Sequence, residues 1–207
     1  MDRPRILIVY GTSYGQTAKI AKAIGEDLTD RGCIVDVRFG KHFTIDWPLE
    51  HYDGLIVGAS VYMQRHQPYI VEFARAYEPF IEGIPTAFFS VSGTAGDESA
   101  EARREARKLV ERFIDRTGWV PDMTASFAGS IPYTKYGALT RYLMQFISRL
   151  TGASTDTTRD HEYTDWDRVA EFAEDYFEEL GAEVAPAPAP EERAAARRVG
   201  GHPRPPK

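Results

Sequence analysis

Cysteine is nearly absent from this chain, since Cys33 is the only one among its 207 residues. No disulfide can therefore form within the chain, which suits a reducing compartment such as the cytoplasm. Cys33 stands at the start of an apolar run, and we expect a small buried residue there rather than a nucleophile.

Long hydrophobic runs and basic stretches are also missing. No uncharged apolar run approaches the roughly 20 residues of a membrane-spanning helix, and residues 1–5 lead directly into the first predicted strand, so we expect no signal peptide. The formal net charge is −6, and no basic stripe carries interleaved aromatic residues, which argues against a nucleic-acid-binding protein. The histidines show no metal-ligand spacing, so we expect no metal site.

What the sequence does contain, near its start, is a strand, a tight turn and a helix. The β-branched run of residues 6–10 predicts a strand buried on both faces. A helix from about Thr17 to Arg31 follows, with Ile20, Ile24 and Leu28 on one apolar stripe. This order places free backbone N–H groups and the positive end of a helix at the carboxyl edge of the strand, which favours a phosphate.

The residues of this turn narrow the choice of phosphate ligand. A nucleoside triphosphatase loop has a lysine after its last glycine, whereas Gln16 follows Gly15 here. A dinucleotide fingerprint has three glycines, and this turn lacks that spacing. Hydroxyls of Thr12, Ser13 and Thr17 remain, enough for one terminal phosphate such as that of flavin mononucleotide (FMN). The alternative is a plain hydroxyl-rich connection between strand and helix.

Strands and helices alternate along the rest of the chain, which predicts an α/β fold with a parallel sheet and right-handed crossovers. Further strands are expected at residues 34–39, 55–60, 85–91 and 124–129, and helices from Pro68, at about 99–117 and from Thr164. Thr164 and Asp167 stand in capping-box register at the start of the last helix. Its buried face is predicted to hold Trp166, Val169, Ala173, Tyr176 and Leu180.

The turn resembles the phosphate loop of the flavodoxin family, T-x-[ST]-x-x-T, with Thr12, Tyr14 and Thr17 at or beside its positions. The resemblance implies a doubly wound five-stranded sheet of order 2-1-3-4-5, with FMN at the carboxyl ends of strands one and three. The loop at residues 60–64 and the loop at 92–97 would then hold the isoalloxazine ring, with Tyr62 stacked on it. The residues expected to contact FMN are Thr12, Ser13, Tyr14, Gly15, Gln16, Thr17, Ser60, Val61, Tyr62, Ser92, Gly93, Thr94 and Ala95. The alternatives are ordinary turn chemistry at 92–94 and a loop aromatic packed on the scaffold at Tyr62.

An insertion and a tail extend this pattern. Between the fifth strand and the last helix lie roughly 35 residues, about 131–163, a long connection for a simple loop. Residues 136–150 have an amphipathic helical pattern, which suits either a helix packed on the domain or one that covers the flavin and meets a hydrophobic substrate, a quinone or the membrane surface. We expect residues 1–181 to form the FMN-binding domain and residues 182–207, rich in alanine and proline, to be a disordered tail.

Further residues resemble the menaquinone-dependent protoporphyrinogen IX dehydrogenases, a flavodoxin-like branch of enzymes of haem biosynthesis. They are Gly58-Ala59-Ser60-Val61-Tyr62, Trp119-Val120-Pro121-Asp122, Thr155-Asp156-Thr157 and Tyr163-Thr164-Asp165-Trp166. Residues 93–98 depart from that family, which has a more basic stretch there.

This resemblance implies that FMN takes hydrogen from protoporphyrinogen IX, a hydrophobic tetrapyrrole, and passes electrons to a quinone. His66 is the candidate proton acceptor, because its unperturbed pKa lies near neutral. Arg65, Lys135 and Arg141 are candidates for pairing with the propionates, although each is more often a plain surface cation. The expected location is cytoplasmic, with peripheral contact to the inner face of the cell membrane through 136–150 as an alternative. An electron-carrier flavodoxin, an NAD(P)H:quinone reductase and a flavin-free binding domain stay open as other functions.

Overall fold

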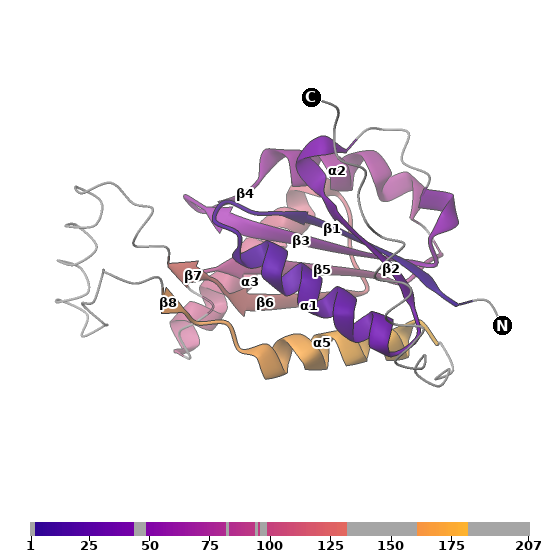
Figure 1. The fold of residues 1–207 in the computed structure, drawn as a ribbon. Coiled ribbons are helices and arrows are strands. Elements are labelled where there is room, and N and C mark those ends of the chain that lie inside the picture. Colours follow the sequence, from indigo (N-terminus) through magenta and orange to yellow (C-terminus); the bar gives the residue numbers. More distant parts are fainter. Residues whose placement is uncertain are drawn as a thin grey trace, which may run out of the picture.

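The computed structural model describes residues 3–43, 49–81, 83–93, 95, 99–131 and 161–181. Figure 1 shows a central sheet with helices on both faces. Its parallel strands are β1 (Arg5–Gly11), β2 (Ile34–Phe39), β3 (Gly54–Tyr62), β5 (Thr86–Ser92) and β6 (Met123–Ala128). They pair in the order β2-β1-β3-β5-β6, which confirms the predicted order 2-1-3-4-5.

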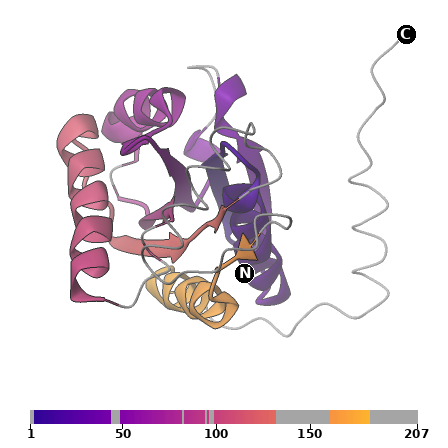
Figure 2. The same ribbon diagram turned by 90° about the vertical axis from the view of Figure 1, so that its left-hand side faces the viewer.

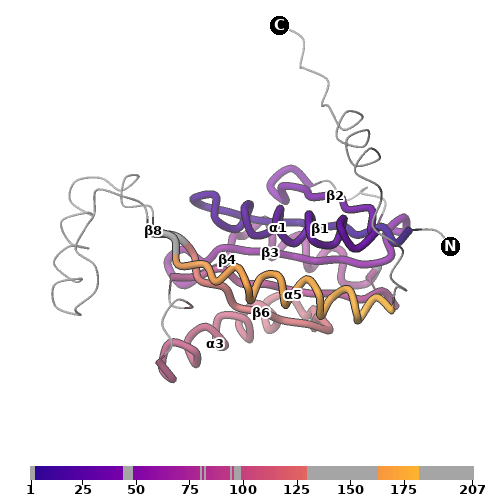
Figure 3. The backbone as a smooth tube through the Cα atoms, turned by 60° about the horizontal axis from the view of Figure 1, so that its bottom comes forward, coloured from indigo at the N-terminus to yellow at the C-terminus, as the bar shows by residue number. Residues whose placement is uncertain are grey.

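The helices lie in two layers around this sheet (Figures 2 and 3). Helices α1 (Gln16–Asp30) and α5 (Trp166–Glu179) lie side by side on one face, while α2 (Pro68–Tyr77) and α3 (Ala100–Thr117) cover the other. Short 3-10 helices are η1 (Gly40–His42), η2 (Leu49–His51) and η3 (Glu78–Phe80).

The apolar run of β1 is continuous because successive side chains enter different cores. Ile6 and Ile8 belong to the cluster beneath α1 and α5, whereas Leu7 and Val9 belong to the cluster beneath α2 and α3. Strand β2 has a neighbour on one side only, and its Ile34 is 42% exposed, as expected for an edge strand. The buried position predicted for Cys33 is confirmed, and burial raises the pKa of its thiol to about 11.

The segment at residues 60–64 is a hairpin rather than the predicted loop. Strand β3 continues to Tyr62, and the chain turns at Met63 and Gln64, whose φ angles are 47° and 64°. It returns as β4 (Arg65–His66), antiparallel to β3, which adds a sixth strand to the sheet. The prediction was wrong here because the turn carries neither glycine nor asparagine, the usual residues at positive φ.

The last helix begins two residues later than predicted. Its N-cap is Asp165, whose Oδ1 accepts hydrogen bonds from Asp167 N at 3.1 Å and Arg168 N at 3.2 Å. The predicted capping box of Thr164 and Asp167 is therefore wrong. Trp166 is 41% exposed rather than buried, whereas the predicted burial of Val169, Ala173 and Tyr176 is confirmed. Leu180 is half-buried at the C-cap.

The base of the insertion is a short antiparallel pair, β7 (Ser130–Ile131) and β8 (His161–Glu162). The amphipathic segment 136–150, with Lys135 just before it and Arg141 inside it, lies outside the described residues, and so does the tail at 182–207.

Candidate functional site

The turn between β1 and α1 leaves the start of the helix without a side-chain cap. The N-cap is Gly15, whose φ of 101° is a conformation that glycine adopts without strain. Gly15 N donates a hydrogen bond to Thr12 Oγ1 at 2.8 Å, and this bond closes the turn. The first N–H groups of α1 and the positive end of its dipole are therefore available to an anion.

Thr17, in the first turn of α1, holds the most informative atom of this corner. Its side chain is fully buried, and Oγ1 has no hydrogen-bond partner among the described residues. A buried hydroxyl without a partner is costly, and such groups in native proteins call for a reason. An oxygen of a phosphate monoester at the start of α1 would accept the missing hydrogen bond. Together with the uncapped helix, the residues of this corner fit a terminal phosphate.

Hydrogen bonds that involve the side chains of Ser60 and Gln67 hold the corner to β3 and to the start of α2. Ser13 N donates to Ser60 Oγ at 3.1 Å, so the turn after β1 is fixed to the end of β3. Gln67 Nε2 donates to Ser13 Oγ at 3.1 Å and also to Ser60 Oγ. Gln67 Oε1 is itself buried and accepts no hydrogen bond from the residues that the structure describes. Gln67 was not predicted from the sequence, although its place directly before Pro68 puts it at the carboxyl edge of the sheet, where the ligand was expected.

The corner opens into a small hollow of about 50 Å³ at the carboxyl edge of the sheet. The described residues that line it are all uncharged and come from the ends of β1, β3, β5 and β6 and the start of α1: Thr12, Ser13, Tyr14, Gln16, Thr17, Ser60, Val61, Val91, Ser92, Gly93 and Gly129. Most of the residues predicted to contact FMN therefore lie together around one hollow.

Four of the predicted contact residues are not among those that line the hollow. Gly15, Tyr62 and Ala95 do not line the hollow, and Thr94 lies outside the described residues. Conversely, Gly129 was not predicted, although it follows β6 at the same edge and its N–H donates to Ser92 O at 3.0 Å. That edge position is the signal by which Gly129 could have been found.

Two tyrosines flank the hollow and contact each other. The rings of Tyr14 and Tyr62 meet edge to face, with centroids 6.2 Å apart. Tyr62 is 50% exposed and Met63, at the tip of the hairpin, is 79% exposed. An exposed aromatic face at the end of β3 can stack on a conjugated ring.

His66 lies away from the hollow, on the side of the sheet that α2 and α3 cover. It is 5% exposed, its Nε2 shares a hydrogen bond of 2.9 Å with Ser90 Oγ, and the rings of Phe88 and Phe113 meet it edge on. Burial, with the nearby charges of Arg116 and Arg112, lowers the pKa of His66 to about 4. The reason for proposing His66 as a proton acceptor, a pKa near neutral, is therefore wrong.

Arg65 lies on β4, exposed, and lines a cavity of about 370 Å³ with Arg112 and Arg116 rather than the hollow. The other two cations proposed for the propionates lie outside the described residues.

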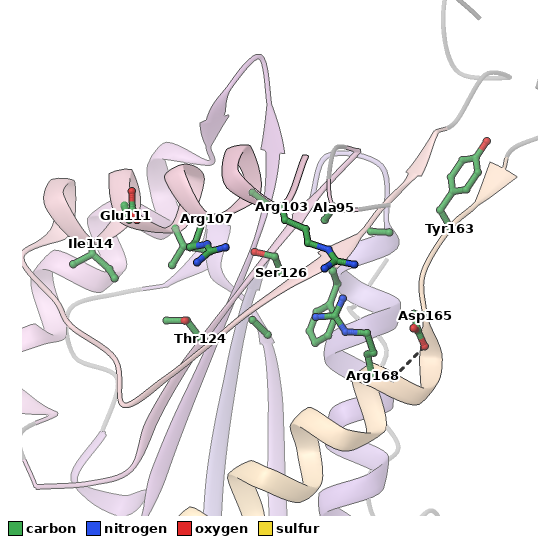
Figure 4. Close-up of a pocket in the computed structure, with 15 residues that line it drawn as sticks. Ala95, Arg103, Arg107, Glu111, Ile114, Thr124, Ser126, Tyr163, Asp165 and Arg168 are labelled. Atoms are coloured by element: carbon green, nitrogen blue, oxygen red, sulfur yellow. Dashed lines mark hydrogen bonds between the residues drawn. The ribbon is translucent and has the colours of Figure 1, made fainter. Parts of the chain in front are cut away.

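A larger groove runs along the outer edge of β6, between α3 and the start of α5 (Figure 4). Its volume is about 770 Å³, within the range of small-molecule sites. Residues 124–128 form its floor, and Arg103, Arg107 and Arg168 line its sides. This groove was not predicted from the sequence, because its lining comes from α3, β6 and the start of α5, which are separate segments of the chain.

No group of three or more metal-ligating side chains occurs among the residues that the structure describes. Within the same residues, no helix is both long and apolar enough to cross a membrane.

Comparison with protein families matches residues 7–158 to the flavodoxin domain. The chain belongs to the flavodoxin family. The flavodoxin-like fold predicted from the sequence is confirmed, and flavin binding is the property that this family membership supports.

Curated relatives give a finer comparison. The chain is 32% identical to a protoporphyrinogen IX dehydrogenase [quinone] of Leishmania major, over 89% of this chain and 79% of the relative. It is 31% identical to the protein of that name from Escherichia coli K12, over 82% of this chain and 92% of the relative. The resemblance to this branch of the family is thereby confirmed.

Solved structures agree on the fold. A short-chain flavodoxin associated with a non-canonical PDU bacterial microcompartment has a TM-score of 0.56 at 14% identity, with 86% of this chain and 99% of that chain covered. Oxidised flavodoxin 1 of Bacillus cereus has a TM-score of 0.52 at 13% identity, with 84% and 97% covered.

Proposed function

We propose that this chain binds FMN through the corner between β1 and α1 and oxidises protoporphyrinogen IX to protoporphyrin IX, with a quinone as electron acceptor. The observation that carries the FMN part is the buried, unpartnered hydroxyl of Thr17 beside the uncapped start of α1. The substrate and the acceptor are supported by the names of the curated relatives.

The corner would hold the FMN phosphate with neutral donors only. The hydroxyls of Thr12, Ser13 and Thr17 and the first N–H groups of α1 supply them, and the positive end of the helix dipole favours the phosphate charge. The bond from Ser13 N to Ser60 Oγ keeps these donors in place, so little reorganisation is needed on binding.

The ring of FMN would lie at the ends of β3 and β5. Tyr62 offers an aromatic face there, and Ser92 and Gly93 offer backbone and side-chain hydrogen-bonding groups at the edge of the hollow. When bound, FMN accepts a pair of electrons with hydrogen from one substrate and delivers electrons to another. Within the described part of the chain no charged side chain lines the hollow, so the contribution of these residues is to bind, orient and exclude water.

The test uses the full chain, loaded with FMN and mixed without oxygen with protoporphyrinogen IX. We expect a yellow protein whose flavin absorbance bleaches on mixing and returns when a menaquinone analogue is added. A protein that takes up no FMN would overturn the proposal as a whole. A yellow protein that protoporphyrinogen IX does not bleach would leave flavin binding standing and exclude the dehydrogenase, with an electron carrier as the remaining function.

A further inference from the structure

Two arginine side chains, those of Arg103 and Arg168, lie at one end of the groove along β6. Arg103 comes from the first turns of α3 and Arg168 from the first turn of α5, and Figure 4 shows their guanidinium groups extended across the groove towards each other. These helices lie on opposite faces of the sheet. Because β6 is the last strand of the sheet, side chains from the two faces can approach each other past its free edge.

Neither guanidinium is neutralised by the residues that the structure describes. No ion pair joins Arg103 or Arg168 to a carboxylate there. The carboxylate of Asp165 is engaged as the N-cap of α5, and Glu111 lies further along α3 (Figure 4). Two like charges that converge without a counter-ion repel each other, and a bound anion would remove that repulsion. The planar guanidinium matches a carboxylate with two parallel hydrogen bonds.

The rest of the groove offers apolar contacts beside polar ones. Ala106, Val110 and Ile114 of α3 and Phe127 of the floor are apolar, whereas Arg107, Glu111, Thr124 and Ser126 are charged or polar. Its cationic end adjoins the flavin corner, because Ala128 lines the groove and the next residue, Gly129, lines the hollow. Tyr163 also lines the groove, and its N–H donates to Gly129 O at 3.4 Å. The groove and the hollow therefore share an edge.

We infer that Arg103 and Arg168 bind the carboxylate side chains of the substrate, an amphipathic dianion, and so orient its apolar ring system towards the corner. This inference rests on the proposed function, because protoporphyrinogen IX is the substrate whose two propionates the pair would hold. A quinone carries no carboxylate, so its binding gains nothing from the pair. Arg103 and Arg168 are thus specificity-determining residues for one of the two substrates.

The test compares the FMN-loaded wild type with Arg103→Gln, Arg168→Gln and the double variant. The matched control is Arg104→Gln, because Arg104 is the next residue on α3, is also exposed and does not line the groove. Each variant is assayed with protoporphyrinogen IX, with its dimethyl ester and with varied quinone. A charge-assisted hydrogen bond is worth about tenfold in affinity or more, so each single variant should raise the KM for the free acid about tenfold and the double variant about 100-fold.

The other readouts separate recognition of carboxylates from general damage. The kcat, the KM for the quinone and the affinity for FMN should stay within about twofold, and the dimethyl ester should bind the wild type and the variants equally weakly. Arg103→Lys should recover part of the loss, since lysine keeps the charge but not the planar fork. An unchanged KM for the free acid in the double variant, or an equal loss with the ester, would overturn the inference.

A binding titration keeps this test independent of turnover. Protoporphyrin IX carries the same two propionates, and quenching of its fluorescence by the FMN-loaded protein reports binding without any reaction. If the wild type fails to oxidise protoporphyrinogen IX but binds protoporphyrin IX in a manner that depends on Arg103 and Arg168, the proposed function fails and the dianion site stands. If that binding is indifferent to both arginines, the dianion site fails whatever the activity.

Discussion

Thr17 and His66 are both buried polar side chains near the carboxyl edge of the same sheet, but only His66 has a hydrogen-bond partner among the residues that the structure describes. Thr17 Oγ1, in the β1–α1 corner, is fully buried and makes no hydrogen bond to any of these residues, whereas His66, on the β3–β4 hairpin, is paired with Ser90 Oγ at 2.9 Å. Buried polar groups normally find partners within the protein. An unsatisfied one therefore points to a ligand, and a satisfied one points to structure.

From residue type alone, His66 would be the functional residue and Thr17 the structural one, but their surroundings indicate the opposite. Histidine is the usual proton acceptor near neutral pH, whereas a threonine hydroxyl does not change its charge in this range. Here the surroundings of His66 are two aromatic rings and two arginines, which disfavour a second proton on the imidazole. Thr17 stands beside the uncapped first turn of α1, where an anion is favoured. The functional assignment follows the partners that each side chain has and lacks.

The largest effect is expected from removing hydroxyls of the corner. The double variant Thr12→Ala, Thr17→Val should weaken FMN binding by about 100- to 1,000-fold, because a hydrogen bond to a charged group is worth about 1.5–3 kcal/mol. Part of this loss comes from the turn, since Thr12 Oγ1 no longer accepts from Gly15 N. Titration of the ligand-free protein with FMN, followed by flavin fluorescence, measures it.

Single variants at Thr17 show whether its hydroxyl serves the ligand rather than the fold. Thr17→Ser keeps the donor and should bind FMN within about fivefold of the wild type, whereas Thr17→Val should lose about tenfold or more. The free energy of unfolding of the ligand-free Thr17→Val protein, measured in urea, should be at least that of the wild type, because valine replaces an unpartnered hydroxyl with a group of the same shape. A destabilised Thr17→Val that binds FMN normally would make Thr17 a structural residue like His66.

His66 should affect stability instead, in a way that depends on pH. Its folded pKa of about 4 lies below the ordinary 6.5, so between these values the unfolded chain binds more protons than the folded one. The free energy of unfolding therefore falls as the pH drops from about 6.5 to 4, by on the order of 2–3 kcal/mol from this group. Above that window the contribution is constant.

Urea unfolding at several pH values measures this contribution as a difference between proteins. His66→Gln should be less sensitive to acid than the wild type, and His42→Gln, at an exposed histidine on η1, is the matched control. FMN affinity near neutral pH should be nearly equal in all three proteins. If His66→Gln has the same acid sensitivity as the wild type, the imidazole is not held neutral by burial.

Much of the fold could be predicted because its signals are local. The run of residues 6–9 is apolar throughout, since a central parallel strand enters a core on each face, and the four-residue spacing of Ile20, Ile24 and Leu28 matches one face of α1. The strand order depends on pairing between distant segments and came from the family resemblance instead. The β3–β4 turn was missed because Met63 and Gln64 carry no sign of positive φ.

In the candidate site, too, residues that are neighbours in sequence could be predicted, whereas residues from distant segments could not. Thr12, Ser13 and Thr17 could be proposed because they are neighbours in one turn, whereas Gln67 and Gly129 reach it from other elements. Thr164 is the clearest example of a residue whose role depends on residues far away in the sequence. Its hydroxyl was expected to cap α5, but it instead contacts Ala128 and Gln16, which are 36 and 148 residues away in sequence. Asp165, with no such competitor, caps the helix.

Thr164 supplies an intermediate case between Thr17 and His66. Its Oγ1 accepts from Gln16 Nε2 at 2.8 Å and donates to Ala128 O at 2.7 Å, so it joins the start of α1 to the end of β6. Gln16 lines the hollow and is only 5% exposed, so Thr164→Val would leave its amide without this partner. Because Thr164 is satisfied by the protein, we expect its loss to act mainly on stability, as at His66.

We expect Thr164→Val to lower the free energy of unfolding by about 1–2 kcal/mol, the usual cost of a buried polar group that loses its partner. FMN affinity should fall by only about twofold to fivefold, through the loosened amide of Gln16, which is the smallest effect of the set. Thr164→Ser keeps the hydroxyl and should restore both values. If Thr164→Val has wild-type stability and binds FMN as weakly as Thr17→Val, then Thr164 is a ligand-binding residue. In that case, a hydrogen-bond partner within the protein would no longer distinguish structural residues from binding residues at this edge of the sheet.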